Sequence, residues 1–145
     1  KETGFTRYLY CYPVKTGDYM IEEALTEKII GCAYEVYNSL GSGFLESVYH
    51  NALTIALEEQ CIDVKSEYPI KVLFREKIIG NFYADLLVED KIIIEIKAID
   101  HLAKIHEIQI VNYLKATGLD IGLLINFGSE NIQVKRKYRK SNMEN

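Results

Sequence analysis

The chain of 145 residues has no tryptophan, two prolines and three cysteines. No apolar run approaches the roughly 20 residues that a membrane-spanning helix requires. The N-terminal stretch KETGFTRYLYCYPVKTGDYM lacks the apolar centre of a signal peptide. These absences predict a protein that works in the cytoplasm without entering a membrane.

The three cysteines, Cys11, Cys32 and Cys61, are widely separated along the chain. This spacing supports neither a disulfide framework nor a CxxC site for zinc or an iron–sulfur cluster. We therefore interpret the three side chains as buried or idle thiols.

Positive charge is also scarce, since 17 Lys and Arg stand against 21 Asp and Glu, which gives a formal net charge of −4. This balance does not indicate a nucleic-acid-binding protein. The distribution is uneven, because residues 131–145 carry five basic side chains and one acidic one. A basic tail on an acidic body can contact phosphates, although charged tails are more often simply solvated.

A hydrophobic content of 48% is enough for one compact core in a chain of this length. Apolar residues recur at helical spacing over residues 20–40, and Gly41-Ser42-Gly43 then ends the helix. A second helix is predicted over residues 44–60. The residues that it should bury are Val48, Ala52, Ile55 and Ala56.

After Cys61 the pattern changes to strands. The predicted strands read YPIKVLF, KIIGNFYADLLV, KIIIEIKA, DIGLLINFG and NIQVKRKYR. A third helix over residues 100–118 separates the third strand from the fourth and ends at Gly118, a predicted C-cap. The order α-α-β-β-β-α-β-β indicates one α/β domain over residues 20–140. Residues 1–19 form an extension without an assigned role, and residues 141–145 form a tail.

The second and third predicted strands carry ionisable side chains among isoleucines. Side chains alternate between the faces of a strand, so Glu95 and Lys97 share one face of KIIIEIKA. If the turn between the strands has three residues, 89–91, Asp85 lies opposite Glu95 with Cβ atoms about 4.5–5.5 Å apart. A two-residue turn would instead pair Asp85 with Ile94 and send the carboxylates to opposite faces.

Two carboxylates that face each other inside a sheet repel, and their desolvation adds to the cost. A shared proton, a salt bridge or a metal ion would relieve the repulsion. Lys97 can pair with Glu95, but one ammonium group serves two acids poorly. A divalent cation serves both, and Mg²⁺ is the usual partner of carboxylates and phosphate oxygens. The alternative is an edge hairpin whose charges are simply solvated.

Polar residues on two predicted helices can be tested against this pair. Glu46 and Tyr49 share a face of the second helix. His106, Gln109 and Tyr113 share a face of the third helix, which follows the third strand closely and must pack back on the sheet. Taken one by one, such residues are more often ordinary surface polarity.

These residues together resemble the PD-(D/E)XK nuclease superfamily. The pattern of Asp85 followed by Glu95-Ile96-Lys97 is similar to the motif that names it, with Ala84 in place of the proline. GFLESVY, at residues 43–49, resembles the signature of the GxxExxY protein family, as does EYPI at Glu67. Gln109 and Tyr113 resemble the QxxxY motif of the RecB-like and lambda-exonuclease-like branches. The resemblance covers residues 21–127.

The resemblance implies a restriction-endonuclease-like core with a mixed central sheet of four to five strands flanked by helices. It makes Asp85 and Glu95 ligands of Mg²⁺ or Mn²⁺, together with the backbone carbonyl of Ile96. Lys97 would orient the attacking water or help to deprotonate it. Other residues would add a ligand, contact substrate or support the site: Glu46, Gln109, Tyr113, Tyr49, His106 and Glu67.

The implied function is metal-dependent hydrolysis of phosphodiester bonds in nucleic acid, with DNA favoured over RNA. A homodimer would help so small a domain to surround its substrate. The alternatives are a non-catalytic module that binds nucleic acid or supports assembly, and a purely structural interaction protein.

Overall fold

The computed structural model describes the backbone of residues 18–139 and the side chains of residues 22–139. The elements follow the predicted order. They are α2 (Asp18–Leu40), α3 (Glu46–Glu59), β1 (Val64–Phe74), β2 (Lys77–Val88), β3 (Ile92–Lys97), α4 (Lys104–Thr117), β4 (Ile121–Asn126) and β5 (Gln133–Tyr138). The predicted extension and tail lie outside the described residues, apart from Asp18 and Tyr19, which begin α2.

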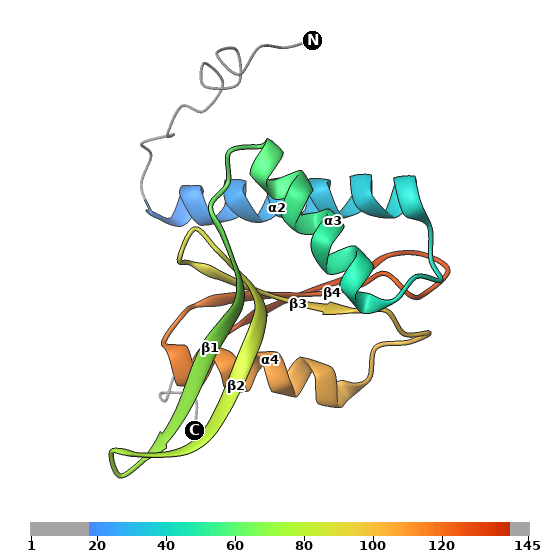
Figure 1. Cartoon of the computed structure of the whole chain (residues 1–145). Coiled ribbons are helices and arrows are strands. Elements are labelled where there is room, and N and C mark those ends of the chain that lie inside the picture. Colours follow the sequence, from blue (N-terminus) through green and yellow to red (C-terminus); the bar gives the residue numbers. More distant parts are fainter. Residues whose placement is uncertain (1–17, 140–145) are drawn as a thin grey trace.

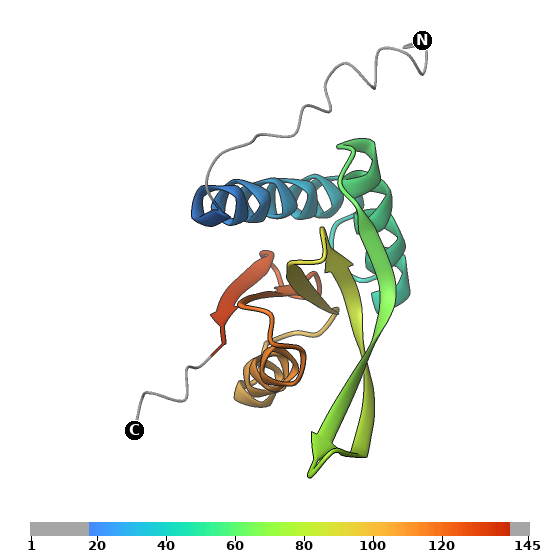
Figure 2. The same cartoon turned by 90° about the vertical axis from the view of Figure 1, so that its left-hand side faces the viewer.

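The five strands form one mixed sheet in the order β1-β2-β3-β4-β5. β3 and β4 are parallel, and the other neighbouring pairs are antiparallel. Helices α2 and α3 lie on one side of the sheet and α4 on the other, while the β1–β2 hairpin extends well beyond these layers (Figures 1 and 2). The predicted α/β fold with a mixed sheet flanked by helices is confirmed.

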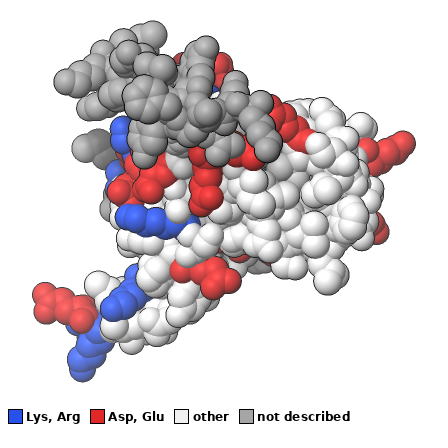
Figure 3. All heavy atoms as spheres, turned by 45° about the horizontal axis from the view of Figure 1, so that its top comes forward, with Lys and Arg blue, Asp and Glu red and all other residues white. Residues whose placement is uncertain are grey.

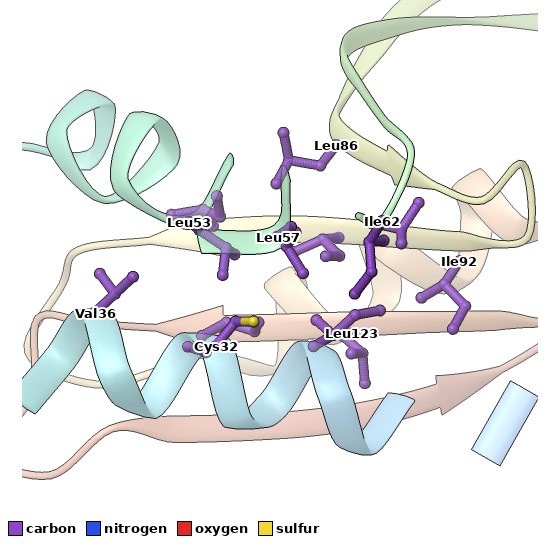
Figure 4. Close-up of a cluster of buried hydrophobic side chains, with 14 of the residues drawn as sticks. Cys32, Val36, Leu53, Leu57, Ile62, Leu86, Ile92 and Leu123 are labelled. Carbon is purple, nitrogen blue, oxygen red and sulfur yellow. The ribbon is translucent and has the colours of Figure 1, made fainter. Parts of the chain in front are cut away.

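The larger core lies between the sheet and helices α2 and α3 (Figure 4). Alternate residues of β3, namely Ile92, Ile94 and Ile96, are fully buried in it. The smaller core lies under α4 and includes Ile93 and Ile110. This alternation confirms that the isoleucine run of β3 fills both faces of an interior strand.

The buried side of α3 differs from the prediction. The structure fully buries Tyr49, Leu53 and Leu57. Of the predicted residues, Ala52 and Ala56 are partly buried against the larger core, whereas Ile55 is 57% exposed. Helical spacing identified an apolar stripe that lies one position away from the true one, because α3 carries two overlapping stripes. Packing against α2 and the sheet selects between them, and this choice is not encoded in the period.

The cysteine prediction holds for one of the two cysteines in the described part of the chain, and Cys11 lies outside that part. Cys32 is a buried free thiol in the larger core. Cys61 is disulfide-bonded, so the interpretation of this residue as an idle thiol is wrong. Separately, no helix among the described residues is long and apolar enough to cross a membrane.

The turn between β2 and β3 has the three-residue register, which is the one of the two alternatives that places Asp85 opposite Glu95. Lys91 N donates to Val88 O at 2.9 Å, and both central residues, Glu89 and Asp90, have φ angles above +50°. This is the geometry of a type I′ turn. Lys91 is then an extra residue, because Val88 pairs with Ile92 and not with Lys91.

Buried Asn126 connects the ends of β3 and β4. Its Oδ1 accepts hydrogen bonds from Ile99 N and Gly128 N, each at 3.0 Å, and its Nδ2 donates to Ile99 O at 2.9 Å. Gly128 packs directly on this segment, because a Cβ there would lie 2.2 Å from Ile99 N. The chain that leaves Lys97 is therefore held against β4.

We expect Gly128→Ala to lower the free energy of unfolding by about 3 kcal/mol or more, because backbone atoms cannot move aside as a flexible side chain can. Gly31→Ala is the matched control. Gly31 lies in α2, where an added Cβ would meet nothing within 4 Å, and this change should stabilise the helix by about 0.5–1 kcal/mol. Urea unfolding measures both values. Equal stability of the two variants would contradict the expectation.

Candidate active site

Asp85 and Glu95 lie one step beyond the last paired residues of the β2–β3 ladder, Leu86 and Ile94. Their carboxylates replace the next ladder bonds. Asp85 N donates to Glu95 Oε1 at 3.1 Å, and Ile96 N donates to Asp85 Oδ2 at 2.7 Å. The two acids are therefore held face to face where the strands separate, as the predicted register requires.

Burial makes this pair of acids costly to ionise. Glu95 is 5% exposed, and burial together with the nearby Asp85 raises its pKa to about 8. The hydrogen bond from Asp85 N and the charge of Lys97 oppose the rise. Burial also raises the pKa of Asp85, against the hydrogen bond from Ile96 N. Without a cation beyond Lys97, the pair retains a proton at neutral pH.

Lys97 follows on the same face of β3, at its C-terminal end. It is half-buried and pairs with Asn126 of β4, and its carbonyl accepts from Phe127 N at 2.8 Å. Its ammonium group lowers the pKa of Glu46, Asp85 and Glu95. Yet within residues 22–139 Lys97 forms no ion pair closer than 4.0 Å. The ammonium therefore lies near three acids without being bound to one.

Glu46 is the first residue of α3, which lies with α2 on the side of the sheet opposite to α4. Its side chain keeps contact with solvent, although partial desolvation is the main cause that raises its pKa. The charge of Lys97 opposes this rise and that of Asp85 adds to it. Glu46 is therefore close enough to Lys97 and Asp85 for their charges to act on it.

Tyr49 supports the turn that precedes Glu46. Its buried hydroxyl donates to Gly41 O at 2.5 Å and accepts from Phe44 N at 3.2 Å. The ring stacks on Phe127 with centroids 4.7 Å apart. Because Tyr49 is fully buried, its contribution to the site is to hold the 41–44 turn and, through it, the start of α3.

His50 was not assigned a role from the sequence, but it lies at this site. It is one helical turn after Glu46, and its charge lowers the pKa of Asp85 and Glu46. Its Nε2 lies 3.3 Å from Ser66 Oγ of β1. The i, i+4 spacing of Glu46 and His50 is the signal that could have identified it.

Glu67 lies on β1 opposite Asp85, between the paired residues Ser66 and Tyr68. It is skipped by the β1–β2 ladder and has a φ of 52°, so β1 is interrupted beside the site. The exposed carboxylate adds slightly to the rise in the pKa of Asp85. Three neighbouring strands thus each place an acid at the same level of the sheet.

On α4, Gln109 Nε2 donates to Tyr113 Oη at 2.8 Å. Burial and the charges of Glu95 and Asp85 raise the pKa of Tyr113, which places its hydroxyl near the pair. His106 lies differently from the other two. Its Nδ1 accepts from Ala103 N at 3.0 Å, so its ring caps the start of α4.

The donor set fits a hard divalent cation that keeps much of its water. Among the described residues, no group of three or more His, Cys, Asp or Glu is arranged to hold a metal ion. Asp85 and Glu95 each use one oxygen in a hydrogen bond, and no buried side-chain oxygen in residues 22–139 lacks a partner. Their second oxygens therefore keep some contact with solvent. Two carboxylates supplemented by water or phosphate are what Mg²⁺ commonly binds in proteins.

Comparison with known proteins supports this assignment of the fold. The sequence model of a family described as the PD-(D/E)XK nuclease superfamily matches residues 23–139. No curated protein matches the chain. Solved structures that are similar include the crystal structure of SSO0001, with a sequence identity of 18% and a TM-score of 0.53. The match covers 95% of this chain and 75% of the SSO0001 chain. At this identity the likeness shows the fold alone. Because the family model matches most of the chain, this chain belongs to the PD-(D/E)XK nuclease superfamily.

Proposed function

We propose that this protein hydrolyses phosphodiester bonds of nucleic acid, with DNA as its substrate and Mg²⁺ or Mn²⁺ as its cofactor. The observation that carries the proposal is the buried Asp85–Glu95 pair with Lys97 beside it. A fold kept only for structure has no use for two buried acids that repel. The QxxxY pair and the GFLESVY segment further support placement in the RecB-like branch and the GxxExxY family.

The chain's own groups then have distinct tasks. Asp85, Glu95 and the carbonyl of Ile96 would hold the metal, and Glu46 would add a ligand directly or through water. Bound Mg²⁺ lowers the pKa of water and offsets charge on the phosphate. Lys97 is free to orient the attacking water and to stabilise the negative charge that develops in the transition state. Tyr113, fixed by Gln109, presents its hydroxyl on the α4 side of the site.

The basic end of the chain contributes less phosphate contact than its composition suggests. Lys137 is paired with Glu107 at 2.9 Å, and Arg139 with Asp120 at 2.9 Å. Lys135 and Arg136 of β5 are exposed without such partners within the described residues. They lie across the sheet from β1, so they can hold a distant part of a substrate at most. A homodimer would add further contacts and stays a prediction.

The second candidate is a non-catalytic module that binds nucleic acid or supports assembly. The acidic balance of the chain favours it, since duplex binding relies on neutralised phosphates. Such a module needs no metal, so Mg²⁺ should leave its melting temperature unchanged. A metal site instead gains stability by linkage, about 2.7 kcal/mol at a concentration of 100 times Kd. Melting of wild type and Asp85→Asn with and without Mg²⁺ separates the candidates.

We expect Lys97→Ala to reduce cleavage by about 10²- to 10³-fold, because one preorganised charge at the transition state is lost. Glu95→Gln should abolish it while retaining the bond from Asp85 N. The assay uses linear, nicked, branched and single-stranded DNA with Mg²⁺ or Mn²⁺. Lys28→Ala, at an exposed position of α2, is the control for removal of a lysine. No cleavage by wild type on any substrate, or equal cleavage by Lys97→Ala, would disprove the nuclease.

In metal-free buffer we expect the free energy of unfolding to fall as the pH rises from 4.5 to about 8. The pKa of Glu95 is raised on folding, so the folded state keeps a proton that the unfolded state releases in this window. Wild type should lose on the order of a few kcal/mol in the free energy of unfolding across this range, and Glu95→Gln should not show this loss. Urea unfolding in EDTA across this range measures the difference.

Saturating Mg²⁺ provides the control for this pH dependence. A cation that binds both carboxylates favours their ionised forms, so the fall should disappear in wild type. Glu95→Gln should gain little from Mg²⁺ at any pH. If wild type and variant show the same slope in EDTA, Glu95 does not carry the effect.

A further inference from the structure

A pocket of about 810 Å³ lies between the extended β1–β2 hairpin and α4. This volume is within the range of small-ligand sites, about 300–1,000 Å³. On the hairpin side it is lined by Val72, Leu73 and Phe82, and on the helix side by one face of α4 that includes Ile105 and Ile108. Gln109 and Tyr113 belong to its lining, but no sequence motif described above accounts for the hairpin side of the pocket.

The pocket combines aromatic and basic side chains. Phe82 is 43% exposed, and the centroid of its ring lies 5.8 Å from that of Tyr113, a buried residue of the lining. Lys71 and Lys115 are both exposed at the pocket, and no acidic residue of the described part of the chain lines it. Positive charge around an apolar floor therefore stands out on a chain whose net charge is −4.

Gly80 helps to keep the pocket open. A Cβ at this position would lie 2.9 Å from Cε2 of the Phe82 ring. The missing side chain thus leaves room for the ring at this place on β2, where Phe82 is partly exposed and lines the pocket. Beyond the pocket, the hairpin forms a separate lobe (Figure 3). The tip of this lobe carries charges of both signs, whereas the pocket lining within residues 22–139 has basic residues and no acidic ones.

The pocket adjoins the candidate active site at Tyr113. Tyr113 belongs to both, since the charges of Glu95 and Asp85 act on its hydroxyl and its ring contacts Phe82. Gln109, its hydrogen-bond partner, also lines the pocket. Phe82 precedes Asp85 by three residues on β2. A ligand in the pocket is therefore adjacent to a phosphate held at the acids.

We propose that this pocket takes an unpaired nucleobase beside the scissile phosphate, so that the substrate is a single strand or a single-stranded end. The proposal rests on the proposed function and specifies its substrate class. Base stacking on aromatic rings with flanking lysines is how single strands are bound without sequence preference. A base within a duplex would have to leave its stack to reach Phe82, at a cost of a few kcal/mol.

The test compares Phe82→Ala with Phe74→Ala, an exposed phenylalanine on the same hairpin that does not line the pocket. Binding of a labelled oligothymidylate of about 12 nucleotides and of its blunt duplex is measured by fluorescence anisotropy in EDTA. Phe82→Ala should weaken single-strand binding by about 5- to 150-fold, as expected for one stacked base. Phe74→Ala should bind as wild type does, and both melting temperatures should stay near that of wild type.

The lysines provide a second, independent measurement. Lys71→Glu and Lys115→Glu should each reduce the salt dependence of single-strand binding, because each removes a phosphate contact. Lys77→Glu, exposed on the hairpin outside the pocket, is the matched control and should not change it. An oligouridylate of the same length shows whether the strand is DNA or RNA.

Equal binding by Phe82→Ala and Phe74→Ala, or tighter binding of the duplex than of the single strand, would overturn the proposal. So would a change from dimer to monomer in Phe82→Ala without loss of oligonucleotide binding, since a second copy would then cover the pocket. Because EDTA prevents metal-dependent cleavage, these results do not depend on catalysis. Failure of the nuclease assay with intact, Phe82-dependent binding would reject the proposed chemistry alone.

Discussion

The register between β2 and β3 is the constraint on which the site depends. A slip of one residue would send Asp85 and Glu95 to opposite faces of the sheet. The turn at Glu89 and Asp90 prevents this, although a positive φ is uncommon for residues other than glycine. Contacts with the start of β1 hold the turn: Glu89 N donates to Asp63 O, Asp63 N donates to Glu89 Oε1, and Lys65 pairs with Asp90.

That register places two acids where the fold alone would place apolar side chains. Each carboxylate accepts one backbone hydrogen bond, which satisfies the separated strands, but burial still raises the pKa of both. The isoleucines around them supply the stability that offsets this cost. Stability and function therefore compete within β3, and a bound cation would relieve the competition.

Much of the fold follows from local patterns, whereas several details of the site do not. Alternation in β2 and β3 predicted the strands and the facing carboxylates. Period alone misplaced the buried stripe of α3, because Tyr49 and Leu53 are chosen by contact with other layers. His50 belongs to no motif described above, and although its spacing from Glu46 places both on one face of α3, the approach of α3 to β1 is what brings it to Asp85.

The sequence by itself determined the order of elements, the interior position of β3 and the candidates Asp85, Glu95 and Lys97, because these depend on short-range alternation and turn length. Only the tertiary structure decided how Glu46 reaches the pair and that Tyr113 separates the acids from a pocket. Those relations join β2, α3 and α4 across the two faces of the sheet. They depend on packing between distant segments, which no local pattern records.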